Sequence, residues 1–144
     1  MSEDNKRVVR AIEEAWDSGK LDELDQYFAP NFEDHSALPG MPSDQETRKM
    51  IHGMSVGAMP DRKVEIQDII AEGDKVMIRC RATGHNKNGM PWLGADANDA
   101  PVDFEMWGIY RLENGKVVEH WGCNDALTLL VQTGAWTPPP MPGA

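Results

Sequence analysis

The stretch V-V-E-H-W-G-C-N-D-A-L-T-L-L-V-Q-T-G-A-W, residues 117–136, predicts a strand that runs directly into a short helix. Successive side chains of a strand point to opposite faces, so Trp121 and Cys123 share one face and His120 lies on the other. If Trp121 faces the interior of the protein, His120 therefore faces outward. Asp125 stands where the strand meets the helix.

The local sequence leaves two roles open for Asp125. As the residue before A-L-T-L-L-V-Q, it is suited to cap the N-terminus of the helix. If the extended geometry persists to this position, its carboxylate points the same way as Trp121. A partly dry site beside an indole raises the pKa of a carboxyl group, and such a group transfers protons near neutral pH. One residue can serve in both roles.

Length and charge narrow the class of protein. The 144 residues favour a single domain over 1–144, with 137–144 as a loose proline-rich tail. The net charge of −10 argues against nucleic acid and membrane surfaces as partners. No apolar run approaches membrane-spanning length, so a cytoplasmic protein is expected. Cys80 and Cys123 lie in strand-like runs and are expected to be buried free thiols.

The part of the chain before residue 60 shows helical patterns. Apolar spacing predicts a helix over 5–17 and a short second helix that ends at Pro30. A third helix opens with a capping box at 43–46. Between the second and third helices, the breaker-rich segment N-F-E-D-H-S-A-L-P-G-M-P is expected to be a loop that carries Phe32 and His35.

Strand patterns follow, with alternating apolar and polar residues over 62–71, 75–84, 101–112 and 116–123, and a final helix over 125–132. The long connection 86–100, which carries Trp92, is interpreted as a loop over the mouth of a cavity. Helices followed by antiparallel strands indicate an α+β fold. We expect a curved sheet of four or five strands with helices on one face, a cone that encloses a pocket.

Six segments in order carry a family resemblance: F-E-D-H-S-A-L-P-G, M-P-D-R-K-V-E-I-Q-D-I-I-A-E-G-D-K-V, T-G-H, W-L-G, I-Y-R-L-E-N-G-K-V-V-E-H-W-G-C-N-D and L-L-V-Q-T-G-A. Together they resemble the SnoaL-like polyketide cyclases, or ester cyclases, of the NTF2-like superfamily, over about residues 8–135. The resemblance implies a cone-shaped α+β barrel, usually a homodimer, with neither a metal nor an organic cofactor. Members of the family close a polyketide ring by intramolecular aldol condensation.

The resemblance also assigns residues. The aspartate that ends W-x-x-x-D is the family's general acid/base, and this position is Asp125. His35 matches the family's D-H pair, which implies a place at the cavity, although a solvated loop histidine is the alternative. The chain departs from the family at A-D-A-N-D-A and at 106–108. No histidine stands between His85 and His120, where the cyclases supply one.

We expect six further residues to line the substrate pocket: Trp107, Trp121, Glu105, Phe32, Trp92 and Met54. Glu105 beside Trp107 resembles a carboxylate in an apolar site, although alternation alone does not decide which face of 101–112 is inside. A solvated face is the alternative for Glu105. Four histidines without H-x-H or H-E-x-x-H spacing argue against a metal site, and His52 is expected on a helix surface.

The expected function is that of a cofactor-free lyase or isomerase that acts on a small hydrophobic carbonyl compound, as in aldol-type cyclisation. A ligand-binding module without turnover is one alternative. A hydrolase or dehydratase on the same fold is another, and it needs a water-activating Asp-Arg or His-Asp pair. A carboxylate and a histidine that converge inside one pocket would favour an enzyme over a binding module.

Overall fold

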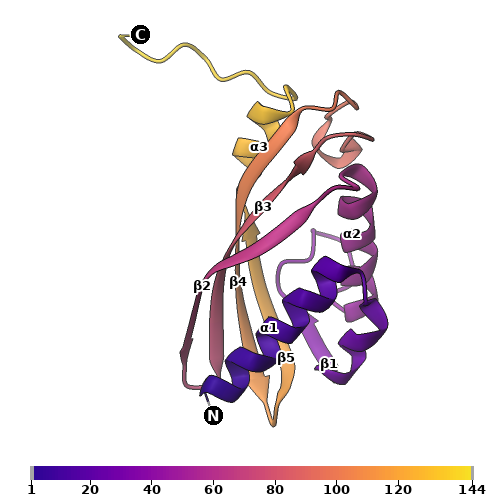
Figure 1. Cartoon of the computed structure of the whole chain (residues 1–144), viewed down its shortest axis with the longest axis vertical. Coiled ribbons are helices and arrows are strands. Elements are labelled where there is room, and N and C mark those ends of the chain that lie inside the picture. Colours follow the sequence, from indigo (N-terminus) through magenta and orange to yellow (C-terminus); the bar gives the residue numbers. More distant parts are fainter. Residues whose placement is uncertain (1, 144) are drawn as a thin grey trace.

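The computed structural model describes residues 2–143. Along the chain lie α1 (Ser2–Ser18), η1 (Leu21–Gln26), β1 (Phe28–Asp34), α2 (Gln45–Ala58), β2 (Lys63–Glu72), β3 (Lys75–His85), η2 (Pro91–Leu93), β4 (Pro101–Glu113), β5 (Lys116–Asn124) and α3 (Ala126–Gln132). Helices α1 and α2 lie on one side of a curved sheet, and α3 lies at the end where β5 finishes (Figure 1). None of these helices is long and apolar enough to cross a membrane.

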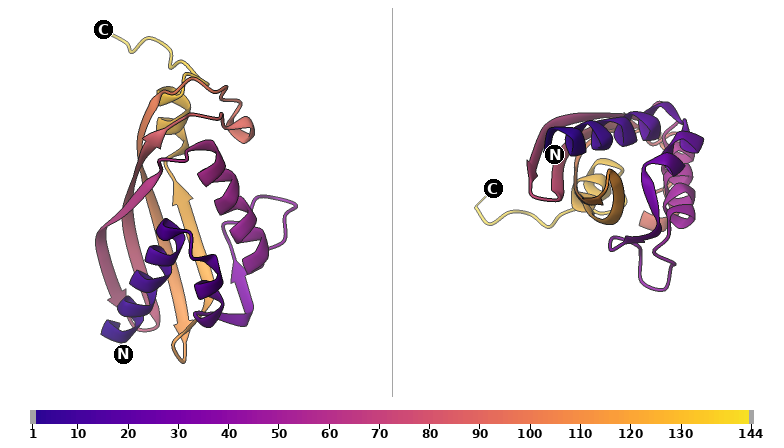
Figure 2. Two further views of the ribbon diagram at one scale, coloured as in Figure 1. Left: turned by 45° about the vertical axis from the view of Figure 1, so that its right-hand side comes forward. Right: turned by 90° about the horizontal axis from the view of Figure 1, so that it is seen from below.

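The five strands form one sheet in the order β1-β5-β4-β3-β2. Strand β1 runs parallel to β5, and the other neighbours are antiparallel. Seen along its length, the sheet curls around the space that α1 and α2 cover (Figure 2). The sheet does not close on itself, so the cone is open between β1 and β2, where the two long helices pack. This arrangement confirms the expected α+β cone with a mixed sheet.

Strand β1 occupies the region that the sequence assigned to a helix end and a loop. Phe28 begins the strand, and the strand continues to Asp34. Pro30 lacks a backbone N–H, but β1 is an edge strand, and an edge tolerates a residue that cannot donate to a ladder. The pairing with β5 is irregular between Phe28 and Glu33. Breaker residues therefore mark a distorted strand here.

Strand β2 contains a β-bulge that reverses its alternation. The register with β3 shifts between Ile66 and Asp68. One extra residue moves every later side chain to the opposite face. Ile69 therefore packs against the core with Val64, whereas Ile70 is 57% exposed. The bulge explains why Ile69 is out of phase with the simple strand pattern.

The core divides into two clusters along the cone. The larger cluster joins α1 to the middle of the sheet and contains Ile12, Val76 and Tyr110. The smaller cluster lies towards α3 and contains Phe104 and Leu129. The space between the sheet and the helices that these clusters leave open is the cavity described below.

The connection 86–100 packs into the smaller hydrophobic cluster of the core. Met90 and Ala95 are buried in it and hydrogen-bond to each other through their backbones. Trp92, which was expected to line the pocket, is 41% exposed and is not among the cavity residues.

Helix α2 differs from the sequence prediction in phase. Its N-cap is Asp44, whose side chain accepts from the Thr47 N–H, one residue later than the predicted cap. Met54, which was expected in the pocket from the sequence, is exposed and is not among the cavity residues. His52 lies on the inner side and lines the cavity.

The two cysteines differ from each other in exposure. Cys80 is buried as expected, and burial raises the pKa of its thiol to about 12. Cys123 is exposed, so the prediction of two buried thiols is wrong for this residue.

Candidate active site

A cavity of about 400 Å³ lies between the inner face of the sheet and helices α1 and α2. Binding pockets for small molecules have volumes of roughly 300–1,000 Å³, so this one accommodates a small organic molecule. Its walls combine apolar side chains with an unusual number of ionisable ones: Glu13, Asp17, Asp34, Arg48, His52, Arg62 and His120. The chemistry of the site depends on how these groups are paired.

The closest pair is Asp34 and His120. The parallel register of β1 and β5 sets the two residues side by side. Nδ1 of His120 lies 3.0 Å from Oδ1 of Asp34, and both side chains are more than nine-tenths buried. Ser36 donates its hydroxyl to the same carboxylate oxygen at 2.5 Å, and its backbone N–H donates at 3.0 Å. The carboxylate is therefore held from two sides, and it orients the imidazole.

The pKa values of this pair favour a charged carboxylate beside a neutral imidazole. Burial acts to raise the pKa of Asp34, but hydrogen bonds from His120 and Ser36 and the Arg48 charge outweigh it and hold the pKa well below its usual range. Burial and the Arg48 charge lower the pKa of His120 to about 4, against the pull of Asp34. With Asp34 ionised, the proton of the neutral ring belongs on Nδ1, and Nε2 keeps a free lone pair.

Two glycines make room for the imidazole. Gly108 in β4 and Gly122 in β5 face each other across the ladder. A Cβ on Gly122 would lie 2.8 Å from Cε1 of His120, and a Cβ on Gly108 would lie 3.1 Å from Nε2. The contact at Gly122 is too short for any real side chain, and the one at Gly108 would require the ring to shift by a few tenths of an ångström. Glycine at these positions therefore leaves room for the ring on the inner face.

Arg48 links the pair to the rest of the cavity. Its Nη1 lies 3.5 Å from Asp34, and its Nη2 donates to the Tyr110 hydroxyl at 2.9 Å. Tyr110 in turn donates to Glu13 at 2.5 Å. Burial raises the pKa of Glu13, against the Tyr110 hydrogen bond and the Arg48 charge. The Arg48 guanidinium also lies over the rings of Trp16 and Tyr110, which fixes its position.

Asp125 lies outside this cavity. It caps α3 by accepting from the Thr128 N–H at 3.1 Å and the Thr128 hydroxyl at 2.6 Å. The carboxylate is exposed, and these hydrogen bonds lower its pKa. The expectation of a partly dry Asp125 with a raised pKa is therefore wrong, and the helix-cap role is confirmed. Its two chain neighbours, Asn124 and Ala126, line the cavity.

His35 also lies on the outer face. Its Nε2 is 3.0 Å from Glu119, and its ring stacks on Trp121 at 4.7 Å. His35 and Trp121 are absent from the cavity lining, so the expectation that these two residues face the substrate is wrong. Glu33, His35 and Glu119 offer ligand atoms within 4.8 Å of one another, but Arg111 already donates to Glu119 and neutralises it.

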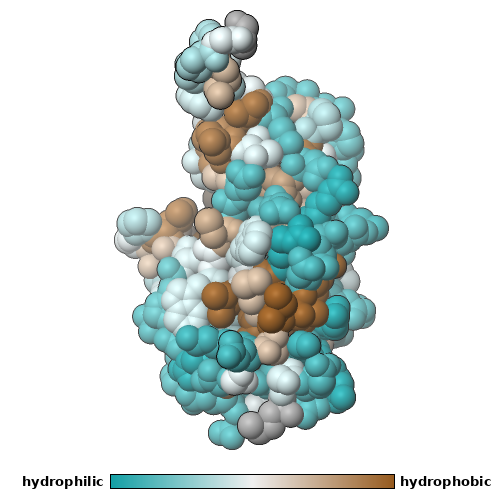
Figure 3. All heavy atoms as spheres, turned by 90° about the vertical axis from the view of Figure 1, so that its left-hand side faces the viewer, coloured by the Kyte–Doolittle hydropathy of each residue, from teal (hydrophilic) through white to brown (hydrophobic). Residues whose placement is uncertain are grey.

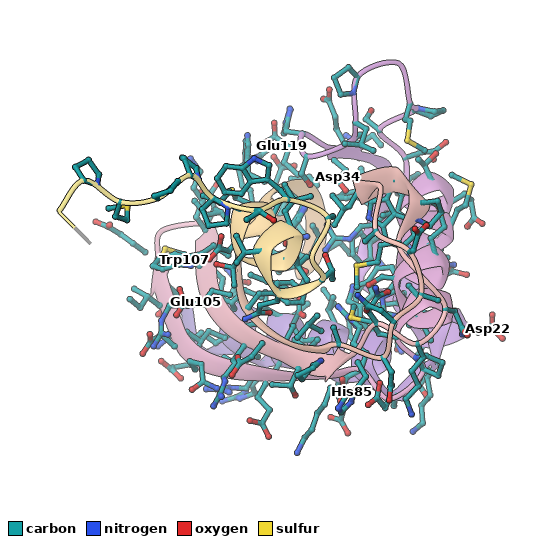
Figure 4. All side chains as sticks on the ribbon, turned by 90° about the horizontal axis from the view of Figure 1, so that it is seen from above. Asp22, Asp34, His85, Glu105, Trp107 and Glu119 are labelled. Carbon is teal, nitrogen blue, oxygen red and sulfur yellow. The ribbon has the colours of Figure 1, made fainter. Side chains whose placement is uncertain are left out.

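The remaining predicted pocket residues divide between the outer surface and the core. Glu105 accepts from Arg79 at 2.7 Å and from the Trp107 indole at 3.0 Å, on the side opposite Asp34 (Figure 4). Trp107 borders the cavity, but its side chain is 46% exposed. Phe32 packs edge-on against Phe28 in the core rather than against the cavity.

The sequence interpretation missed Asp34 and His120, although a signal for His120 was present. His120 and Gly122 share one face of β5, and glycine inside a strand often marks a close approach. That signal favours the His120 face as the crowded, functional one. Asp34 is the aspartate of the D-H pair, but its segment was assigned to a loop and the pair was interpreted through its histidine. The same assignment made His35, its neighbour, the more prominent candidate.

A curved mixed sheet around a cavity, with helices across its open side, defines an α+β cone of the NTF2-like class. Within this class, the family model described as SnoaL-like polyketide cyclase matches residues 6–133. The match spans most of the chain, so the chain belongs to the SnoaL-like polyketide cyclase family, as the sequence resemblance indicated.

Solved structures agree with this assignment. A candidate polyketide cyclase from Bacillus cereus is 29% identical, with 93% of this chain and 83% of that chain covered and a TM-score of 0.79. IdmH, a candidate polyketide cyclase from Streptomyces antibioticus, is 29% identical, with coverages of 90% and 98% and a TM-score of 0.79. AclR, a candidate hydroxylase from Streptomyces galilaeus, shares the fold at 23% identity, with coverages of 97% and 87% and a TM-score of 0.83. The search of curated proteins gives no match.

Proposed function

We propose that the protein is a cofactor-free acid/base enzyme that acts on a small carbonyl compound, with His120 as the base and Asp34 as the residue that positions it. The observation that supports this most strongly is the buried Asp34–His120 pair, 3.0 Å apart, on the wall of the cavity. A binding module without turnover has no need of a neutral imidazole held by an ionised carboxylate in a dry site.

In the proposed reaction, Nε2 of His120 removes a proton from a carbon next to a carbonyl group. Asp34 stabilises the imidazolium that forms, and Arg48 lies beside the pair, where it stabilises negative charge. The resulting enolate carbon attacks a second carbonyl in the same molecule, which closes the ring. The imidazolium then returns its proton to the new alkoxide, so the enzyme ends in its starting state.

The cavity contributes by holding the two reacting carbons together. Confinement of this kind supplies up to roughly 7–11 kcal/mol of the barrier in well-oriented intramolecular reactions. General base catalysis adds a factor of about 10²–10⁴. Neither contribution requires a group from outside the chain, which fits the cofactor-free chemistry expected from the family.

A second candidate function uses the same residues. His120 with Asp34 and Arg48 with Asp34 are the two kinds of pair that activate water in a hydrolase or dehydratase. A product that incorporates labelled oxygen from water would favour hydrolysis. An isomeric product without label would favour cyclisation.

The base is testable without the natural substrate. Ring opening of 5-nitrobenzisoxazole requires only the removal of one C–H proton and releases a coloured phenolate. We expect the wild-type protein to accelerate this reaction, and His120→Gln to lose about 100-fold or more. His35→Gln on the outer face is the matched control and should retain full activity. Equal rates for wild type and His120→Gln would refute the assignment.

We also propose that the outer face of the sheet forms the homodimer expected from the family. Ile70 and Trp107 are exposed apolar residues on this face, and apolar side chains gather in its middle (Figure 3). Light scattering should give twice the mass of the chain, and Trp107→Lys should give the mass of one chain. A wild-type monomer at micromolar concentration would contradict this proposal. The cytoplasmic location expected from the sequence stays a prediction.

A further inference from the structure

We infer that the cavity binds a carboxylate-bearing molecule, with the carboxylate at Arg62 and the remainder of the molecule extending towards His120. This inference rests on the proposed function for the direction of the substrate, but not for the anion site itself. It makes the substrate a small carbonyl acid rather than a neutral ester or amide.

The first observation is a group of buried nitrogen atoms without partners. Among the described residues, Trp16 Nε1, His52 Nε2 and Arg62 Nε are buried without a hydrogen-bond partner, and all three residues line this one cavity. Buried polar atoms are rarely left unpaired, because each lost hydrogen bond costs about 1–3 kcal/mol. The indole and guanidinium nitrogens can only donate, so the missing partner must supply acceptors.

The second observation concerns the charge of Arg62. Burial lowers the pKa of its guanidinium, against the attraction of Glu13 and Asp17. Among the described residues, no carboxylate forms an ion pair with it, and its Nη2 donates to the Met106 sulfur at 3.7 Å. Arg48, the other arginine of the cavity, has a carboxylate oxygen of Asp34 3.5 Å from its Nη1, although this buried nitrogen also makes no hydrogen bond.

The acids nearest to Arg62 are otherwise engaged. Asp17 accepts the Val64 backbone N–H at 2.9 Å, and Glu13 accepts from Tyr110. Burial raises the pKa of Glu13, so this group is held towards its neutral form. Glu13 and Asp17 attract the Arg62 guanidinium without pairing directly with it. Planar carboxylates match its paired donors better than any neutral group does.

The imidazole of His52, which lines the cavity together with Arg62, adds no further positive charge there. The His52 ring packs against Trp16 at 4.7 Å between centroids. Burial and the Arg62 charge lower the pKa of His52 to about 4, so it is neutral at physiological pH. The neutral ring, the indole and the guanidinium together form an aromatic site with one unpaired positive charge, on the same cavity as His120.

The test compares two probes that differ only in charge, 2-naphthoate and 2-naphthamide. Titrations followed by ¹H–¹⁵N spectra should show naphthoate binding at least tenfold more tightly than naphthamide. The Trp16 indole N–H signal, assigned with Trp16→Phe, should move downfield as it gains an acceptor. Arg62→Gln should remove the preference for naphthoate, whereas Arg81→Gln, which loses an exposed pair with Asp103, should keep it.

Three results would overturn the inference: equal affinity for both probes, no binding of either, or a preference that survives in Arg62→Gln. Absence of binding would indicate that water fills the donor site, and a surviving preference would indicate that the anion binds at another group such as Arg48. Arg62→Lys keeps the charge but loses the planar fork, so it should retain part of the preference if Arg62→Gln proves unstable.

Binding and turnover separate this inference from the proposed function. His120→Gln should keep the naphthoate preference while it loses activity on 5-nitrobenzisoxazole. If the wild-type protein prefers naphthoate but is inactive, the anion site is supported and the proposed catalytic function is refuted. If the wild-type protein is active but shows no preference for naphthoate, the catalytic function is supported and the anion site is refuted.

Discussion

The two faces of strands β4 and β5 carry the same kinds of side chain in opposite states. On the outer face, Glu105 pairs with Arg79 and Glu119 with Arg111, all at the protein surface. On the inner face, His120 is buried against an ionised carboxylate and beside glycine. Residue type does not distinguish the faces, because an imidazole, a carboxylate and an aromatic ring meet on each, with His35 on the outer face and Asp34 on the inner face supplied by the neighbouring segment 28–36.

The difference shows that burial and pairing decide which groups can transfer protons. Outer-face carboxylates such as Asp103 have their pKa values lowered by a partner arginine, so they stay charged and unreactive. The inner imidazole has its pKa lowered mainly by burial, so it is a neutral base over the whole physiological range. Solvent-exposed ion pairs of the outer kind contribute only about 0–1 kcal/mol to stability.

The largest difference between the two faces is expected when one carboxylate on each face is neutralised. Asp34→Asn removes the charge that positions His120 and should lower activity on 5-nitrobenzisoxazole by about 100-fold. Asp103→Asn on the outer face should change it by less than twofold. Steady-state kinetics at pH 7 measures both. Similar losses in the two variants would show that the faces do not differ as described.

A smaller effect is expected from crowding the imidazole. Gly122→Ala places a Cβ 2.8 Å from Cε1 of His120 and should displace the ring, with a loss of about tenfold or more in activity. Gly53→Ala in α2 meets no atom within 4 Å and should stabilise the helix slightly by up to about 1 kcal/mol. If Gly122→Ala stays active and the NMR signal of the His120 imidazole does not shift, a Cβ at position 122 does not displace the ring, which would contradict this account.

The smallest effect on activity is expected at Asp125. Asp125→Ala removes the cap of α3 and should cost about 1 kcal/mol of unfolding free energy, measured by urea denaturation. Activity should stay within twofold, because the carboxylate lies outside the cavity. Thr128→Ala, which removes one of the two partners, should cost less. A large loss of turnover with unchanged stability would restore Asp125 as a catalytic residue.

Much of the fold was predictable from the sequence, because alternation and helical spacing report directly on packing. The predicted strand 75–84, with Cys80 inside, corresponds to β3 almost residue for residue. Strand β1 was not predictable, since Pro30 argues against a strand unless its edge position is known. The bulge in β2 likewise depends on its pairing with β3, which the sequence does not specify locally.

The site was predicted on the correct strands but on the wrong face. Alternation correctly separated His120 from Trp121, yet it carries no information about which of them faces the helices. The choice of Trp121 as the inner residue moved Asp125 with it. His35 was placed at the cavity by the D-H pair of the family, and Glu105 by its neighbour Trp107, with the face of 101–112 undecided. Only the tertiary arrangement of α1 and α2 over one face decides the phase.

The central claim is that His120 is a neutral base with its proton on Nδ1, and it is open to direct measurement. A pH titration of ¹⁵N-labelled imidazole signals, with His120 assigned by His120→Gln, reports both the tautomer and the pKa. Because the folded pKa lies below the usual value of 6.5, the neutral form should persist as the pH falls and be lost only near pH 4. A protonated Nδ1 with a pKa of about 4 is the predicted result. Titration near 6.5, or a proton on Nε2, would contradict the account.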